Sequence, residues 1–170
     1  MKRFLLALLS IMMIGFVSSC KDDDDNTEID AVKNKENKMN GEKFMLEKRS
    51  EDGVKMDPSG LLYLVNEAGV GEKPSAVDTV CVSYTGKTIK GTTFVSTTTT
   101  IALVDLMEGL RIGVRHMTVG ANYTLYAPYY LMFGATPTER TYDGKAIQIL
   151  PYSALVYDVE LLSIIKPGEK

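Results

Sequence analysis

The chain has 170 residues, of which 45% are hydrophobic and 24% charged, a composition typical of one globular domain with short additional segments. Its formal net charge of −3 argues against nucleic-acid binding, which needs a concentrated basic face. With 1 histidine and 2 distant cysteines the sequence shows no metal-ligand spacing, and it has no Gly-rich phosphate loop.

Residues 1–19 are predicted to be a signal peptide rather than part of the fold. A basic start precedes an apolar run over 4–17 that is too short to span a bilayer. The next residues, Val17-Ser18-Ser19-Cys20, resemble a bacterial lipobox. This resemblance implies that Cys20 carries lipid and anchors the chain to a membrane. The alternative is an ordinary secretory signal with an unmodified cysteine.

A polar segment over 20–36 follows, and we expect a flexible acidic tether there. Its run of aspartates at 22–25 resembles signals that send some Gram-negative lipoproteins to the outer face of the outer membrane. The alternative destination is the periplasmic leaflet. Both locations are extracytoplasmic, and with Cys20 lipidated only Cys81 is left, so no internal disulfide is expected.

Residues 37–55 are predicted to form a short helical lead-in. The segment is rich in Lys, Glu and Met, has Phe44 at its centre, and is stopped by Asp52-Gly53. It is too short to bury a dimer interface, so we expect a monomer in which this segment packs against the following domain or leads into it.

The compact domain is predicted to cover 56–167. An amphipathic helix over 106–117 has apolar residues at helical spacing and ends at Gly120. A turn is expected at 85–86 and a bulge at Gly91. Alternating apolar residues predict five strands, over 60–66, 79–84, 87–94, 123–127 and 155–162. Five strands and one short helix indicate an α+β domain in which an antiparallel sheet wraps round the helix.

Four motifs in this domain are SGLLY at 59–63, VSYTG at 82–86, MTVG at 117–120 and LVYDVELL at 155–162. In order and spacing they resemble the FKBP family of peptidyl-prolyl cis-trans isomerases. The resemblance implies a curved antiparallel sheet wrapped round one short helix, with a pocket between the helix and the concave sheet face. It also implies activity on X-Pro bonds of extracytoplasmic polypeptides, without a metal or cofactor.

Such an enzyme depends more on a pocket that fits the substrate and excludes water than on reactive side chains. Rotation about an X-Pro amide is slow because it breaks C–N resonance, with a barrier of roughly 18–20 kcal/mol. The twisted amide has lost charge separation and leaves water more easily, so an apolar pocket favours it over the planar amide. A fixed backbone N–H can hold the substrate while the bond turns.

Each pocket position that we transfer from the family falls on an apolar or aromatic residue of this sequence. Leu106 and Ile149 are expected to bind substrate, and Met107 to offer its backbone N–H. The residues expected to be catalytic are Tyr84, Phe94, Met107, Leu110, Phe133 and Tyr157. The alternative for the aromatic and helical members of this set is that they are ordinary core residues.

Several positions depart from the family pattern. Val95 stands where the family has Asp, Leu110 replaces a Trp at the pocket floor, and Phe133 lacks the hydroxyl of a Tyr. The chain is shorter between Phe94 and Gly109, and residues 136–146 form an added polar loop. Four tyrosines are candidates to replace the lost hydroxyl: Tyr129, Tyr130, Tyr142 and Tyr152.

These departures motivate a second hypothesis, a binding or chaperone-like lipoprotein with weak or no catalysis. A third is a purely structural envelope protein. We assign no chemistry to three other features: His116 is expected on the surface, Cys81 as a buried thiol, and Asp158 with Glu160 on a solvated strand face.

Overall fold

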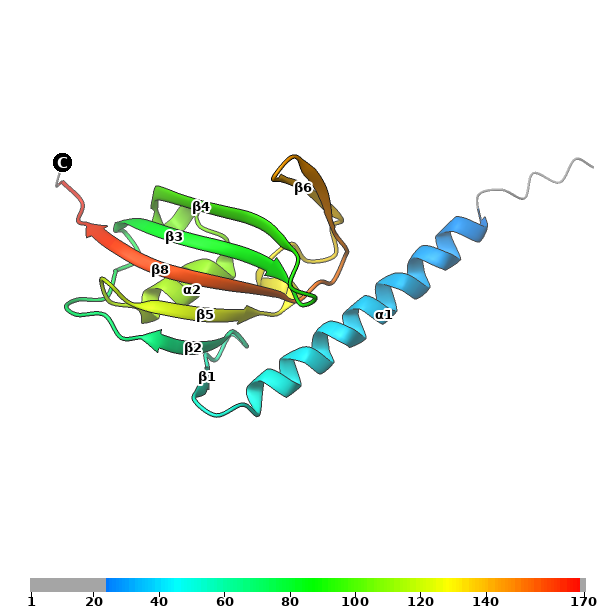
Figure 1. Ribbon diagram of the computed structural model, residues 1–170, viewed down its shortest axis with the longest axis horizontal. Helices are drawn as coiled ribbons and strands as arrows, with labels where there is room; N and C mark the ends of the chain where they lie inside the picture. The colour runs from blue at the N-terminus through cyan, green and yellow to red at the C-terminus, as the bar shows by residue number, and fades with distance from the viewer. Residues whose placement is uncertain (1–23, 169–170) are drawn as a thin grey trace, which may run out of the picture.

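The computed structural model of the chain describes residues 24–168 (Figure 1). The expected signal peptide at 1–19 and the lipidation site Cys20 lie outside the described residues. Between residues 24 and 168, no helix combines the length and the apolar character needed to cross a membrane.

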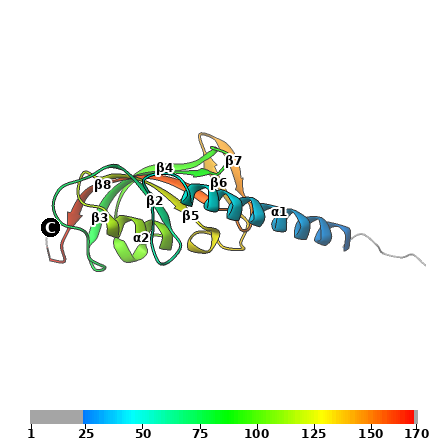
Figure 2. The same cartoon turned by 90° about the horizontal axis from the view of Figure 1, so that it is seen from below.

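An antiparallel six-stranded sheet forms the body of the molecule, with strands in the order β1-β2-β5-β8-β3-β4. The strands are β1 (Val54–Met56), β2 (Leu62–Glu67), β5 (Asn122–Ala127), β8 (Leu155–Ile165), β3 (Thr79–Thr88) and β4 (Thr93–Ala102). Helix α2 (Glu108–His116) lies on one face of this curved sheet (Figures 1 and 2). The predicted α+β class is confirmed; the short edge strand β1 raises the expected number of about five strands to six.

Strand β3 continues through Thr85-Gly86, where a turn was predicted. Gly86 stays extended because it pairs with Val95 of β4 and Tyr157 of β8. The chain turns later, where the Gly91 N–H donates to the Thr88 carbonyl at 2.9 Å and Gly91 has a φ of +84°. The predicted strand over 87–94 and the bulge at Gly91 are therefore wrong, and the ladder irregularity lies between Gly86 and Lys87.

Helix α1 (Asp24–Arg49) is a single element of 26 residues. The expectation of a flexible tether up to residue 36 is wrong for the described part of that segment, and the short lead-in helix is the second half of a longer one. Residues of high helix propensity occupy most positions of α1 and favour one continuous helix. In the second half of the helix, ion pairs one turn apart add support, with Lys38 and Glu42 at 3.9 Å and Lys43 and Glu47 at 3.8 Å.

The second half of α1 is docked on the domain, and its first half projects away from the sheet (Figures 1 and 2). Asn37 donates through Nδ2 to the Pro151 carbonyl at 2.6 Å and to Ser153 Oγ at 3.0 Å. One turn later, a Cβ at Gly41 would lie 3.3 Å from Ala154 Cβ. The absence of a side chain at Gly41 thus allows the helix to lie close against the segment that leads into β8.

The added segment expected as a polar loop over 136–146 forms a β-hairpin instead. Its strands are β6 (Thr138–Tyr142) and β7 (Lys145–Ile149). The turn is made by Asp143 and Gly144, whose φ values of 50° and 70° are those that an Asp-Gly hairpin turn adopts. The hairpin contacts the edge strand β4.

The core lies between α2 and the sheet. Leu110, Val114 and Met117 form the buried stripe of the helix, as their spacing predicts. Gly113 faces Leu125 of β5 so closely that a Cβ there would overlap the Leu125 Cδ1 atom. This glycine sets how near the helix lies to the sheet, and therefore how much room is left at the helix N-terminus.

We expect Gly113→Ala to lower the free energy of unfolding by about 1–3 kcal/mol, because the new methyl group overpacks the contact with Leu125. Alanine favours a helix by about 1 kcal/mol over glycine, so without the clash the substitution would stabilise. Chemical denaturation measures the difference. Arg115→Ala, on the exposed side of α2, is the control and should change stability by less than about 0.5 kcal/mol. A stabilising Gly113→Ala would contradict the packing described here.

Candidate active site

A cavity of about 330 Å³ lies between the N-terminal end of α2 and the sheet. It is bounded by residues of β3, β4 and β8, by the 3₁₀ turn η1 (Leu103–Asp105), and by the segment that enters the β6–β7 hairpin. Its lining consists of Tyr84, Phe94, Val95, Ile101, Asp105, Leu106, Met107, Leu110, Phe133, Arg140 and Tyr157. Apolar and aromatic side chains make up most of this wall, which suits a small apolar ligand.

Aromatic rings form the sheet side of the cavity. Tyr157 from the central strand β8 meets Phe94 edge to face at 5.8 Å and Tyr84 at 6.2 Å. Phe94 in turn meets Phe133 edge to face at 6.3 Å. Edge-to-face contacts hold each ring in one orientation. Tyr157 and Phe94 are only 2% exposed, so both belong to the core and to the cavity wall at the same time.

The helix side of the cavity is built by Leu106, Met107 and Leu110. Met107 is the N-cap residue of α2, and its carbonyl accepts the first helical hydrogen bond from the Arg111 N–H at 2.8 Å. The first N–H groups of a helix have no carbonyl partner within it, and they carry the positive end of the helix dipole. A bound carbonyl oxygen can therefore be accommodated at this end of α2.

The structure brings together all but one of the eight residues that the sequence singled out for the pocket. Ile149 is the exception, since it ends β7, is 1% exposed and belongs to the hydrophobic core rather than to the cavity lining. Four lining residues were not among the eight: Val95, Ile101, Asp105 and Arg140. Val95 and Ile101 are an even number of residues apart on β4 and share a face, but alternation puts them opposite Phe94, so strand periodicity did not indicate them. A ladder irregularity lies opposite Phe94, between Gly86 and Lys87. Arg140 lies in the added hairpin.

None of the four tyrosines proposed to replace the missing hydroxyl lines the cavity within residues 24–168. Tyr129 packs edge to face against Tyr130 and Tyr152, on the side of the domain near α1. The Tyr130 hydroxyl donates to the Ser59 carbonyl at 3.2 Å. A polar group that does lie beside the Phe133 ring is Arg140, whose guanidinium carbon is 5.3 Å from the ring centroid.

Electrostatics in the cavity are set by a neutral phenol and two charges. Burial raises the pKa of Tyr157, the nearby Tyr84 adds to this shift, and the positive charge of Arg140 opposes it. Tyr157 is therefore uncharged at neutral pH. Asp105 and Arg140 carry the charges and come from different elements, η1 and β6.

A larger groove of about 420 Å³ lies elsewhere, between α1 and the β1–β2 edge of the domain. Met45, Leu46 and Met56 are among its lining residues, and Leu46 is 65% exposed. The aromatic rings of the smaller cavity are absent from it, and its lining includes two charged residues, Glu42 and Arg49. The smaller cavity, which has the aromatic wall, is therefore the candidate active site.

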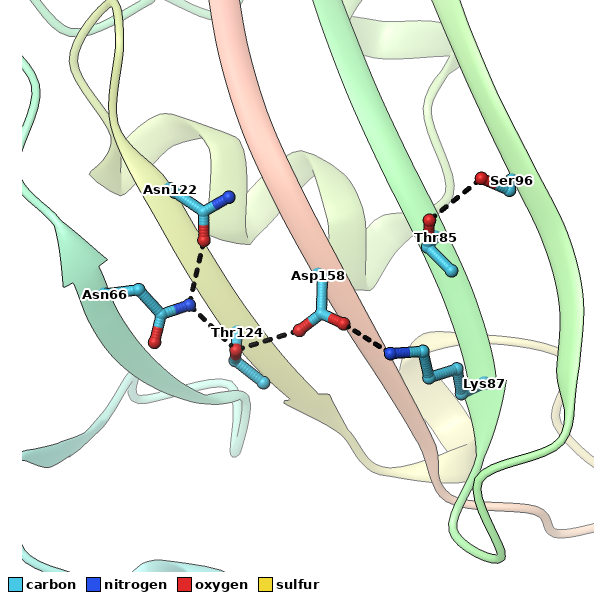
Figure 3. Close-up of polar contacts among 7 residues, drawn as sticks. All are labelled: Asn66, Thr85, Lys87, Ser96, Asn122, Thr124 and Asp158. Carbon is cyan, nitrogen blue, oxygen red and sulfur yellow. Dashed lines mark hydrogen bonds and ion pairs between the residues drawn. The ribbon is translucent and has the colours of Figure 1, made fainter.

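The outer face of the sheet, opposite α2, is polar (Figure 3). Asp158 accepts from Lys87 Nζ at 2.8 Å and from Thr124 Oγ1 at 2.9 Å, and Asn66 donates to Thr124 at 3.0 Å. Thr85 and Ser96 pair on the same face at 2.9 Å. Asp158 thus lies on a solvated face, in hydrogen bonds that join neighbouring strands, and takes no part in the cavity.

His116 differs from the expected surface position. Its side chain is 32% exposed, its Nε2 lies 2.9 Å from Asp57 Oδ2, and its ring stacks on Tyr63 at 4.8 Å. The contact joins the end of α2 to the turn before β2. Cys81 is a half-buried free thiol.

Gly86 keeps the aromatic wall in place because a Cβ there would lie 2.7 Å from Tyr157 Cε1 and 2.8 Å from Phe94 Cζ. We expect Gly86→Ala to push these rings into the cavity and to weaken binding of a proline-containing peptide by about five-fold or more, since overpacking costs about 1–3 kcal/mol. A peptide titration with a parallel unfolding curve measures both effects. Thr85→Ala, on the outer face, is the control and should leave binding unchanged. Full peptide affinity in Gly86→Ala would argue against this cavity as the binding site.

Comparison with known proteins shows to which proteins this chain is related. Residues 70–162 match the family model of FKBP-type peptidyl-prolyl cis-trans isomerase, and residues 16–65 match that of the domain amino terminal to it. FkpA of Aeromonas hydrophila, an FKBP-type isomerase, is 36% identical over 138 residues, which are 78% of this chain and 48% of that protein. The macrophage infectivity potentiator of Trypanosoma cruzi is 32% identical, over 99% of this chain and 85% of its own.

Among solved structures, the crystal structure of FkpA from Escherichia coli superposes with a TM-score of 0.71 at 30% identity, covering 82% of this chain and 64% of that one. The chain spans about half the length of several of the curated relatives that it matches. Family model, sequence identity and fold agree, and the chain belongs to the FKBP-type peptidyl-prolyl cis-trans isomerase family.

Proposed function

We propose that the chain is a peptidyl-prolyl cis-trans isomerase that acts on X-Pro bonds of extracytoplasmic polypeptides in the cavity beside α2. The observation that carries the proposal is the convergence of Tyr84, Phe94, Phe133 and Tyr157 on a hollow next to the start of a helix. The prolyl ring would enter between these rings and Leu110. The Met107 N–H would hold the substrate carbonyl while the amide rotates.

Catalysis in this arrangement comes from the environment and involves no proton transfer. The planar X-Pro amide is more dipolar than the twisted one, so an apolar wall binds the twisted amide better. The neutral Tyr157 phenol keeps the wall uncharged. The geometry therefore lowers the rotation barrier of roughly 18–20 kcal/mol without a nucleophile or a metal.

A specific set of residues supports a second candidate, a binding or chaperone-like protein of the same fold with weak catalysis. Val95, Leu110 and Phe133 all lie on the cavity wall, and each lacks the polar or bulky group that the family resemblance leads us to expect. A wall with fewer fixed contacts still receives a prolyl ring, but it distinguishes the twisted amide from the planar one less well.

We also propose that Cys20 is lipidated and tethers the domain to the outer membrane of a Gram-negative cell. One relative, from Legionella longbeachae, is named outer membrane protein MIP and is 33% identical over 79% of this chain and 57% of its own length. Cys20→Ala should release the protein from the membrane fraction of expressing cells. A variant that stays in that fraction would contradict anchoring through this residue.

A protease-coupled isomerisation assay on the detergent-solubilised chain distinguishes the two functions. We expect the cis-to-trans rate of a proline tetrapeptide to exceed the rate in buffer in proportion to protein concentration. A rate equal to that in buffer, from protein shown to be folded by circular dichroism, would reject the enzyme. Saturable peptide binding without acceleration would establish the binding protein in its place.

Leu110→Trp tests the placement of the cavity floor. A larger aromatic floor increases contact with the prolyl ring, so we expect higher turnover or higher peptide affinity. The converse variant, Phe94→Ala, should lower both. A large-to-small change in the core costs roughly 3–5 kcal/mol of stability, so unfolding must be measured alongside. If Leu110→Trp changes neither quantity, the floor has been misplaced.

A further inference from the structure

The β6–β7 hairpin contributes the cation of the cavity lining, Arg140. Arg140 pairs in register with Ile147, and directly opposite residues of a hairpin share one face. Ile147 packs against the hydrophobic core, which fixes this as the inner face. On the outer face, Gln148 Nε2 donates to Glu139 Oε2 at 2.8 Å. The backbone of the hairpin therefore directs Arg140 towards the cavity.

The guanidinium of Arg140 lies over the Phe133 ring, with 5.3 Å between its central carbon and the ring centroid. A cation over an aromatic ring is attracted by the ring face, and the guanidinium has five N–H donors available for further partners. Among residues 24–168, Arg140 has no ion-pair partner. A permanently charged group is thus held on the cavity wall with its charge not neutralised by a carboxylate of the described chain.

The only anion on the described lining is Asp105, which belongs to η1, next to the start of α2. Asp105 and Arg140 form no ion pair with each other. A ligand therefore meets negative charge at the η1 side and positive charge at the hairpin side. An acidic group on the ligand is disfavoured near Asp105 and favoured near Arg140. The two charges therefore favour one orientation of an acidic ligand in the cavity.

From this arrangement we infer that Arg140 sets substrate preference and selects X-Pro segments with an acidic residue directly before the proline. The inference rests on the proposed function and names its substrate class. The prolyl ring fills the apolar part of the cavity, and the residue before a proline is extended, so its side chain is left at the mouth. A carboxylate there accepts two parallel hydrogen bonds from the guanidinium, a geometry that an amide or an aliphatic side chain does not offer.

The test uses tetrapeptides that differ only at the residue before proline, with Glu, Gln or Leu at that position. For the wild-type chain we expect kcat/KM to be about three-fold higher for the Glu peptide than for the Gln peptide, the size of effect that a partly exposed ion pair produces. Arg140→Gln should bring this ratio to about one. Arg140→Glu should invert it. The rate on the Leu peptide, which has neither charge nor amide at that position, is the reference for each variant. Added salt should reduce the wild-type ratio.

Lys43→Gln is the matched control, because it removes one positive charge from α1, where Lys43 is 78% exposed and is not part of the cavity lining. It should keep the wild-type ratio. A wild-type ratio of one or less, or a preference that survives in Arg140→Gln, would overturn the inference. If no peptide is isomerised, the proposed function is rejected independently of Arg140. The dissociation constants of the Glu and Gln peptides, measured by titration, then test the role of Arg140. Equal constants would reject it.

Discussion

The edge-to-face contact between Tyr157 and Phe94 is the interaction on which the candidate site depends. Tyr157 lies on β8, which pairs with both β3 and β5, and Phe94 lies on the edge strand β4. The two rings join the centre of the sheet to its border. They also form the cavity wall, so the sequence-based alternatives of core residue and pocket residue are not exclusive. A change that disturbs this contact alters stability and ligand binding together.

Much of the fold follows from local patterns in the sequence. Alternation along Leu155, Tyr157 and Val159 correctly predicted the buried face of β8, and helical spacing predicted the buried stripe of α2. The turn predicted at Thr85-Gly86 was wrong. Glycine is common in turns, but Gly86 is needed inside β3 to leave room for two aromatic rings. Only the tertiary structure shows which of these reasons applies.

Two features of the structure depend on tertiary contacts that local sequence patterns do not show. The polar and acidic composition of residues 20–36 suggested a flexible tether, but its described part continues the helix that is docked on the domain through Asn37. Arg140 could not be assigned from the sequence either. It lies in a segment added to the family pattern, and strand pairing with Ile147 is what turns it towards the cavity. Ile149, on the same hairpin, is drawn into the core instead.

The hairpin also affects the tendency of the protein to self-associate. Strand β4 has 10 residues, pairs with β3 on one side, and has a run of four threonines at 97–100. A long edge strand rich in β-branched residues is a template for adding strands from another molecule. Because β6 lies against β4, part of that border is shielded by the protein itself. Shortening the hairpin would thus expose the edge of β4 and promote aggregation, and it would also change the shape of the cavity mouth.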